Sequence, residues 1–319
     1  MSSILVFVES ADGRIKKSSL EAIAFAHAMG GEVTAIAFGN EVSQDELSGL
    51  GNFGATKVLH INDEKLNQGV IQAYASGIAQ AMEKIGADVL VLANSSLGNP
   101  VSARVAIKMD ASLVSNVTEL PSTDGGFSVK RSIYTGKAFA NVELTKAKKI
   151  LAIRKNAAEV KELGGSANVE VFSANFNDAD FSAKITSTEK ATGDILLPEA
   201  EIVVSGGRGL KGSENWGMIE ELAKELGAAT GCSKPVSDMG WRPHHEHVGQ
   251  TGVKVSPQLY IAIGISGAIQ HLAGVNSSKN IVVINKDPEA PFFKAADYGI
   301  VGDAFEVIPK LTEAIKAAK

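Results

Sequence analysis

The sequence predicts an α/β protein with two domains: an N-terminal parallel-sheet domain with an antiparallel addition, and a C-terminal doubly wound domain. Short apolar runs alternate with helical patterns over residues 3–118 and again from residue 202 onward, a pattern typical of parallel sheets covered by helices. Between these stretches, residues 154–195 lose regular periodicity and carry clusters of Asn, Asp, Ser and Gly. We therefore expect the first domain and its connection at residues 1–195 and the second domain at residues 196–319.

The composition of the 319 residues is that of an ordinary globular protein, since 45% are hydrophobic and 21% are charged. The formal net charge of −5 and the lack of a long Lys/Arg run argue against nucleic acid as a partner. Cys232 is the one cysteine, so an intrachain disulfide and a cysteine-rich metal site are excluded. The apolar run at residues 4–8 is too short for a signal peptide or a membrane span, and we expect a cytoplasmic protein.

The N-terminal domain begins with four predicted strands, at residues 4–9, 33–39, 57–61 and 88–94. Helical patterns lie between them, over residues 18–29, near Asp45 and over residues 68–85, and glycines stand where two of these helices should end. Such alternation predicts a parallel sheet. The turn after the fourth strand, at residues 94–98, could hold a phosphate, but a plain strand-to-helix turn is the favoured interpretation.

The pattern then changes to strand-like segments with no helix between them, at residues 112–120, 127–134, 137–144 and 148–154. Glycine-containing turns link them, which predicts an antiparallel addition to the first sheet. A further isolated strand is expected near residues 181–186.

In the C-terminal domain, a polar residue follows each of four predicted strands. The strands lie at residues 202–207, 258–264, 281–284 and 298–302, with a helix expected over residues 215–226. The polar residues that follow them are Arg208, Ser266, Asn285 and Asp303. Ligands of open α/β sheets lie outside the carboxyl ends of the strands, so these residues predict one ligand crevice. The alternative is that each residue only ends its strand or caps the next helix, and Asp303 would be a good N-cap in either case.

The stretch from residue 248 to residue 274 is the strongest candidate for chemistry. A buried strand is followed by a tight turn, and a helix should begin at Ala268. Ser266 and Gly267 would let the backbone approach a ligand closely, and the free N–H groups of the first helical turn favour an anion such as a pyrophosphate. Thr251 and His271 supply a hydroxyl and an imidazole that could face a redox ring. The alternative is a loop threonine and a packed histidine with no ligand.

Other motifs are weaker. The glycines at residues 206–209 read G-G-x-G, which is not the dinucleotide fingerprint G-x-G-x-x-G, so a nicotinamide site is the weaker interpretation. The run His-His-Glu-His at residues 244–247 could bind a transition metal, but its spacing does not match H-E-x-x-H and an exposed polar loop is favoured. No nucleophile elbow is present, and we expect neither a catalytic residue nor a metal.

Four segments resemble the alpha subunit of electron transfer flavoprotein. They are GGRGLKGSENW at 206–216, VGQTG at 248–252, YIAIGISGAIQHLAG at 260–274 and INKDPEAPFFKAADYGIVGDAFEVIP at 284–309. The resemblance is near-continuous over the C-terminal domain and weaker before residue 195. It implies one FAD, held mainly by the C-terminal domain, and a heterodimer with a beta subunit that holds AMP and contacts the N-terminal domain.

Carried over by position, the resemblance implies an FAD site with three parts. The flavin-ring part comprises Arg208, Ser233, Lys234, Val248, Gly249, Gln250 and Thr251, with the threonine hydroxyl at flavin N5. The pyrophosphate part comprises Ser266, Gly267, Ala268, Ile269, Gln270 and His271, whose imidazole reaches the pyrimidine end of the flavin. The adenosine part comprises Asn285, Asp303 and Ala304. Many members of the family carry arginine where this chain has Lys234, and lysine lacks the planar fork of arginine.

The implied function is that of an electron carrier with no substrate of its own. It would accept electrons from flavin dehydrogenases, such as acyl-CoA dehydrogenases of fatty acid β-oxidation, and pass them to a membrane quinone oxidoreductase. Arg208, His271 and the helix start at Gly267 would stabilise negative charge on the reduced flavin. Two alternatives stay open: a bifurcating or pathway-specific relative that uses NADH, and a stand-alone nicotinamide-dependent dehydrogenase.

Overall fold

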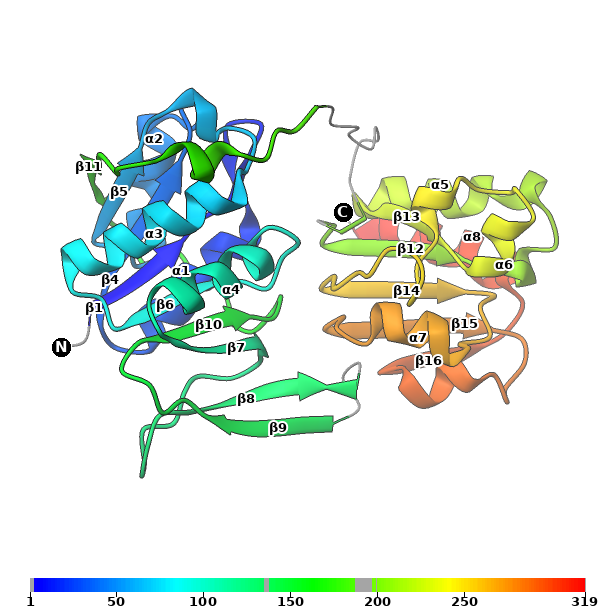
Figure 1. Ribbon diagram of the computed structural model, residues 1–319. Helices are drawn as coiled ribbons and strands as arrows, with labels where there is room; N and C mark the ends of the chain where they lie inside the picture. Colours follow the sequence, from blue (N-terminus) through cyan, green and yellow to red (C-terminus); the bar gives the residue numbers. More distant parts are fainter. Residues whose placement is uncertain (1–2, 135–137, 187–196, 199, 319) are drawn as a thin grey trace. The chain divides into compact units, whose positions relative to one another are not determined.

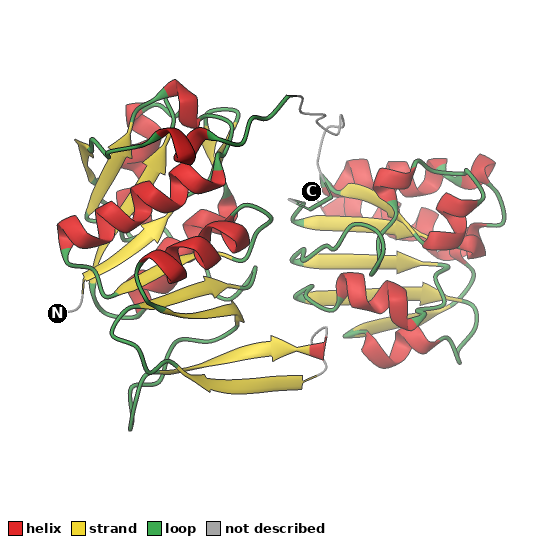
Figure 2. Ribbon diagram, viewed as in Figure 1, coloured by secondary structure: helices red, strands yellow, loops and turns green. Residues whose placement is uncertain are grey.

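The computed structural model describes residues 3–134, 138–186, 197–198 and 200–318. The chain forms two compact units, Met1–Thr188 and Glu189–Lys319, and each is built around its own sheet (Figure 1). Helices cover both faces of each sheet (Figure 2), so the predicted two-domain α/β class is confirmed. The expected boundary between residues 195 and 196 falls at the edge of a stretch outside the described residues, and it stays a prediction.

The first sheet has nine strands in the order β11-β5-β4-β1-β6-β10-β7-β8-β9. Its parallel strands are β1 (Ser3–Phe7), β4 (Glu32–Phe38), β5 (Lys57–Ile61), β6 (Val89–Ala93), β7 (Ser112–Val117), β10 (Lys149–Ile153) and β11 (Asn168–Val171). Its antiparallel strands are β8 (Ser128–Ile133) and β9 (Ala138–Glu143), and β2 (Ser10–Ala11) with β3 (Arg14–Ile15) forms a separate small ribbon.

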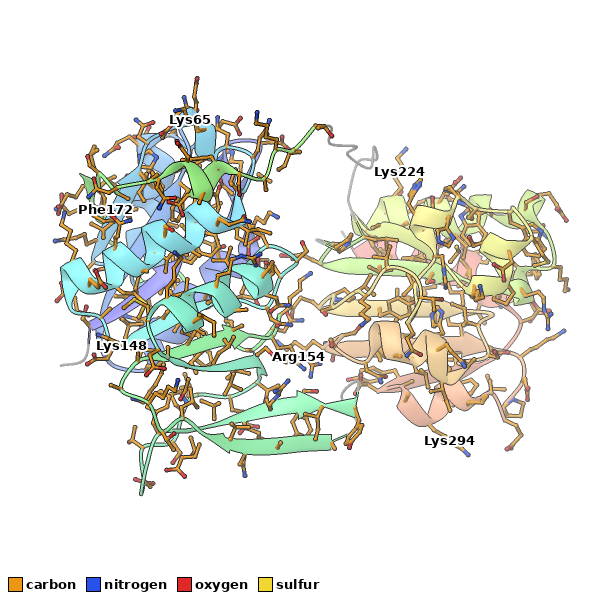
Figure 3. The ribbon with its side chains drawn as sticks, viewed as in Figure 1. Lys65, Lys148, Arg154, Phe172, Lys224 and Lys294 are labelled. Carbon is orange, nitrogen blue, oxygen red and sulfur yellow. The ribbon has the colours of Figure 1, made fainter. Side chains whose placement is uncertain are left out.

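Four α-helices and three short 3-10 segments join the described strands of this unit. The helices are α1 (Lys17–Ala28), α2 (Gln44–Ser48), α3 (Ile71–Ile85) and α4 (Gly98–Lys108). The 3-10 segments are η1 (Gly49–Phe53), η2 (Glu64–Leu66) and η4 (Asp178–Phe181). Helix α1 packs on one face of the sheet, and α3 and α4 pack on the other. Phe172 (Figure 3), after β11, joins the α3 and α4 side. The ammonium of Lys84 lies 4.9 Å from the centroid of its ring.

Several details of the first unit differ from the sequence-based expectation. Strand β11 forms in a stretch expected to be irregular, and β7 runs parallel to its neighbour β10 although an antiparallel strand was expected. Strand β10 is not part of the antiparallel addition either, because it lies between β6 and β7 and runs parallel to both. Its residues Ile150–Ile153 are at most 1% exposed, and such a continuous apolar strand is stabilised by burial on both faces. The strand expected near residues 181–186 does not form, since the chain there leaves η4, which begins with a capping box at Asn177.

The second sheet is fully parallel, with the order β13-β12-β14-β15-β16. Its strands are β12 (Ile202–Gly206), β13 (Ala229–Cys232), β14 (Leu259–Ile263), β15 (Asn280–Asn285) and β16 (Tyr298–Val301). Strand β13 lies on one side of β12 and strands β14 to β16 lie on the other, so the strand order reverses between β12 and β14 and the domain is doubly wound as predicted. Strand β13 was not expected, because Ala-Thr-Gly-Cys offers no apolar run.

Helices cover the second sheet on both faces. The α-helices α5 (Gly217–Leu226) and α8 (Ala304–Ala318) share one core with one face of the sheet. Helix α7 (Ile269–Val275) and the 3-10 segment η8 (Pro291–Ala295) cover the other face. Four short segments lie in the connections between these elements. They are η5 (Arg208–Leu210) and η6 (Ser213–Asn215), between β12 and α5, and α6 (Lys234–Asp238) and η7 (His244–Glu246), between β13 and β14.

The turns that follow β12 and β14 touch through glycine backbones. Gly207 donates its N–H to the Ile263 carbonyl at 2.8 Å, and Gly209 donates to the Gly264 carbonyl at 3.0 Å. A Cβ atom at Gly207 would lie 2.2 Å from the Gly264 carbonyl oxygen, and one at Gly209 would lie 2.7 Å from the Gly264 Cα. The switch point of the sheet therefore has no room for a side chain.

We expect Gly207→Ala to destabilise the second unit by about 1–3 kcal/mol, the usual range for an overpacked site. The residue has φ −117°, a conformation open to alanine, so the substitution tests the steric contact alone. Gly217→Ala is the matched control, because nothing lies within 4 Å of its Cβ position, and it should change stability by at most about 1 kcal/mol. Denaturant unfolding followed by tryptophan fluorescence measures this, since Trp216 and Trp241 both lie in this unit. Equal stability of the two variants would contradict it.

Candidate functional site

The loop after β14 presents unpaired backbone donors to solvent. Within the described part of the chain, no protein acceptor receives the amides from Ser266 to Gln270, and the next amide, that of His271, bonds the Ala268 carbonyl at 2.9 Å. Helix α7 has only seven residues and begins at Ile269, so most of these donors belong to the loop and not to a long helix. Four of these five residues are exposed and Gly267 is buried, and a row of unpaired N–H groups is suited to binding an anion.

Neighbouring elements hold this loop in place. The Ser266 carbonyl accepts from the Phe292 amide at 3.1 Å, and Asn285 Nδ2 donates to the Ile265 carbonyl at 3.0 Å. Gly267 has φ +84°, and a Cβ atom there would lie 2.5 Å from the Phe292 nitrogen. Glycine is therefore required at this position both by its dihedral angle and by the space available.

A second loop, residues 248–253, lies directly on α7. The Gln250 amide donates to the Gln270 carbonyl at 2.7 Å, and a Cβ atom at Gly274 would lie 2.5 Å from Gly249 Cα. Gln250 and Thr251 are exposed at the tip of the loop, whereas Val248 is completely buried. The structure thus brings the predicted segments 248–251 and 266–271 together.

His271 is 7% exposed and lies behind these two loops. Its Nε2 is 2.9 Å from the Tyr260 hydroxyl, its ring meets the Phe292 ring edge-on at 5.6 Å, and its Nδ1 is buried without a hydrogen bond. Burial, and to a smaller extent the nearby His247, lower the pKa of His271 to about 4, although the Val248 backbone acts in the opposite direction. The ring is therefore neutral near pH 7, so His271 offers a hydrogen-bonding group and no permanent positive charge.

The two predicted cationic residues differ in their partners. Arg208 is exposed in η5, and none of the described carboxylates forms an ion pair with it. Lys234 Nζ lies 3.4 Å from Asp238 Oδ1 one turn along α6. Ser233, at the start of α6, is buried and its amide bonds the Gly206 carbonyl at 3.0 Å. Arg208 is thus the more available cation.

The predicted adenosine end already has structural roles. Asn285 Oδ1 accepts from the Asp287 amide at 3.1 Å, and Asp303 Oδ1 accepts from the Phe305 amide at 3.0 Å as the cap of α8. Ala304, the first residue of α8, is buried in the core that this helix shares with the sheet. All three residues nevertheless lie at the carboxyl edge of the sheet, after β15 and β16 (Figure 1).

The run at residues 244–247 does not gather around one point. His244 and His245 are exposed, and His247 is buried. Glu246 accepts a forked pair of hydrogen bonds from Arg242, at 2.8 and 2.6 Å. Among the residues that the structure describes, no group of three or more His, Cys, Asp or Glu side chains is placed to hold a metal ion.

Sequence reasoning missed the residues that support the loops from behind. Tyr260 holds His271, and the Trp216 ring lies 2.6 Å from where a Cβ atom at Gly206 would stand. Arg242 stacks on Trp216 with its guanidinium 5.4 Å from the ring centroid. A tyrosine inside a predicted buried strand was the one available signal, because a buried hydroxyl needs a partner.

Together these features define a class of protein. Neighbouring strands lie about 4.8 Å apart, so the carboxyl edge from β13 to β16 extends over roughly 19 Å. Open amides lie near the middle of this edge, beside the switch point between β12 and β14, and polar groups lie toward both ends. The second unit is therefore a dinucleotide-cofactor domain, of the kind that binds an extended ligand across the ends of a parallel sheet.

Comparison with known proteins identifies the family. Residues 4–177 match the electron transfer flavoprotein domain, and residues 196–276 match the electron transfer flavoprotein FAD-binding domain. The chain is 39% identical to electron transfer flavoprotein subunit alpha of Bacillus subtilis over 98% of this chain and 97% of that protein. It is 39% identical to the subunit alpha of Mycobacterium tuberculosis over the full length of both, and 38% identical to the probable mitochondrial subunit alpha of Caenorhabditis elegans over 99% and 94%. The chain belongs to the alpha subunit family of electron transfer flavoproteins.

Membership confirms the expected resemblance and FAD as the cofactor of this domain type. The residues present fit such a group, since glycine backbones line the switch point, the amides of residues 266–270 are open, and His271 Nδ1 is buried and unpartnered. Of the helices in the described ranges, none has the length and apolar character needed to cross a membrane.

The buried, neutral state of His271 predicts acid sensitivity. Below pH 6.5 the unfolded chain binds a proton at this residue that the folded chain does not bind, so stability should fall as the pH decreases from 6.5 to about 4. One pKa unit corresponds to about 1.4 kcal/mol, and the loss attributable to His271 is therefore roughly 3 kcal/mol. His271→Gln should remove this part of the pH dependence, and the exposed His245→Gln should keep it. Denaturant unfolding at stepped pH values measures the slopes, and identical slopes for all three proteins would refute the assignment.

Proposed function

We propose that this chain is the FAD-holding subunit of an electron carrier with no substrate of its own. The row of open amides from Ser266 to Gln270, beside the glycine-lined switch point, is the observation that carries the proposal. These amides would bind the pyrophosphate of FAD, because unpaired N–H groups in a fixed loop bind an anion without reorganisation. When bound, FAD supplies the chemistry, which is uptake and release of electrons.

The flavin ring would lie along the loop at residues 248–251, between the exposed tip of that loop and the two turns after β12 and β13, which hold Arg208 and Ser233. The Thr251 hydroxyl would hydrogen-bond flavin N5, and the Arg208 guanidinium and the more weakly available Lys234 would face the ring. His271 would donate a hydrogen bond from Nδ1 at the pyrimidine end, since the Tyr260 hydroxyl lies at its other nitrogen. Asn285, Asp303 and Ala304 would then lie at the adenosine end.

The partners follow from the family. The chain would pair with a beta subunit that holds AMP, chiefly through residues 1–195, while residues 196–319 hold FAD. Electrons would arrive from flavin dehydrogenases, such as those that oxidise acyl-CoA esters, and leave to a membrane quinone oxidoreductase. A carrier of this kind needs an exposed cofactor edge, and the crevice loops, with Gln250 and Thr251 at the tip of one of them, are open to solvent.

The chain co-purified with its beta subunit should contain about one FAD per alpha chain, because one continuous carboxyl edge offers one anion-binding loop. Release of the cofactor by acid, followed by chromatography and a visible spectrum, gives the stoichiometry. A purified heterodimer without flavin, or with a nicotinamide in its place, would refute the proposed function.

The difference between the two cations predicts unequal effects on the FAD. Arg208→Gln removes a guanidinium that forms no ion pair with a described carboxylate, so it should lower the potential for the first electron by tens of millivolts, on the order of a hydrogen bond to a charged group. Lys234→Gln should have a smaller effect, because Lys234 already pairs with Asp238. Spectroelectrochemical titration of both variants measures the potentials. A larger shift in Lys234→Gln than in Arg208→Gln would contradict the ranking.

A further inference from the structure

His247 fills the inside of the loop that carries Thr251. It is 3% exposed, pairs with Cys232 in an isolated parallel bridge, and accepts the Val253 amide on its carbonyl at 2.7 Å. A Cβ atom at Gly252 would lie 2.7 Å from His247 Nδ1, and one at Gly249 would lie 3.2 Å from His247 Nε2. The imidazole therefore lies against the backbone of the loop at Gly249 and Gly252.

A second buried histidine, His271, lies close to the same point of this loop. The Cβ position of Gly249 that lies 3.2 Å from His247 Nε2 also lies 3.7 Å from His271 Cα. In the described residues, the Nδ1 atoms of both rings are buried without a hydrogen-bond partner. Two neighbouring histidines that each have a buried ring nitrogen without a partner are unusual, because buried polar atoms are nearly always paired.

The surroundings of His247 connect it to solvent. The ring of His244, which is exposed on η7, has its centroid 5.6 Å from that of His247. On α6, the charged groups that face His247 are Lys234 and Asp238, and from α7 it faces His271. On its own segment, Glu246 is neutralised by the fork from Arg242.

These neighbours keep His247 neutral but easier to protonate than His271. Burial lowers the pKa of His247, and His244 and Lys234 lower it further, whereas the Asp238 carboxylate raises it. Among the residues that the structure describes, no carboxylate affects the pKa of His271, and its ring contacts are with Tyr260 and Phe292 and not with an exposed imidazole. Negative charge arriving in the crevice raises the proton affinity of a nearby neutral base, and His247 is the base with a route to water.

Building on the proposed function, we propose that His247 takes up a proton when the FAD bound at this edge is reduced, and that His244 connects His247 to solvent. One electron passes from a reduced flavoprotein donor to the bound FAD, and the donor is oxidised by one electron. One proton passes from water to the ring nitrogen of His247 that is unprotonated in the neutral form. The charge added to the crevice is balanced without protonation of the cofactor, and the proton returns to water when the electron leaves.

The test is the number of protons taken up per electron, obtained from the pH dependence of the midpoint potential. The FAD-containing heterodimer is titrated for its first electron between about pH 5 and 8, where imidazoles change charge. His247→Gln keeps a polar side chain of similar length but cannot accept the proton. His245→Gln is the matched control, because His245 is the exposed neighbour in the same run.

The wild-type protein and His245→Gln should show the same proton uptake, and His247→Gln should show less, by up to one proton per electron. A residue that only fills the loop would instead weaken FAD binding and leave the uptake per bound FAD unchanged, and that result would overturn the inference. A wild-type heterodimer without reducible FAD would overturn the proposed function as well, so the two failures are distinguishable.

A second variant decides the matter if His247→Gln does not fold. Asp238 is exposed, and its carboxylate raises the proton affinity of His247 from outside the loop. Asp238→Asn should therefore displace the proton uptake to lower pH without a loss of bound FAD. An unchanged pH profile in Asp238→Asn would reject His247 as the proton acceptor.

Discussion

The glycine contact between the turns after β12 and β14 is the constraint on which the second unit depends. Gly207 and Gly209 lie against Gly264 so closely that each backbone donates to the end of β14 and no side chain fits between them. This contact places the Arg208 turn beside the loop of open amides at the switch point, where doubly wound sheets bind their ligands. Strand order alone would bring the two turns near each other, but the glycines make the approach close enough for backbone groups to line the crevice.

The rest of the crevice is built outward from this contact by packing, not by charge. The Trp216 ring packs against Gly206, and the Arg242 guanidinium lies over the Trp216 ring. Arg242 also donates two hydrogen bonds to the Glu246 carboxylate, which hold Glu246 in place. The next residue, His247, fills the loop at residues 248–252, and that loop lies on α7. Residues 206 and 271 are thus joined through one chain of contacts. A substitution that shifts the turn after β12 should therefore also shift the loop at residues 248–252.

Sequence patterns predicted the parallel strands, the doubly wound order and the backbone positions of the candidate site, because apolar runs, glycine stops and polar residues after strands are local signals. They failed for the placement of β7 and β10 and for the existence of β11 and β13, because strand pairing depends on contacts between residues distant in sequence. They also missed Tyr260, Trp216, Arg242 and the support role of His247, since these act through residues distant in sequence. His271 was placed correctly beside the loop at residues 248–251, but its neutral state follows from burial, which no spacing reveals.

Burial also decides how a site of this kind can respond to negative charge. A permanently cationic histidine behind the loops would have to be desolvated, at a cost of several kcal/mol without a paired carboxylate. Two neutral imidazoles avoid that cost and still provide protonatable nitrogens close to the crevice. Arg208 keeps its permanent charge at the surface, where water solvates it. The permanent positive charge of Arg208 thus lies at the surface, and the groups that can gain a positive charge, the two imidazoles, lie inside. Only a charge on an imidazole can appear when an electron arrives and disappear when it leaves.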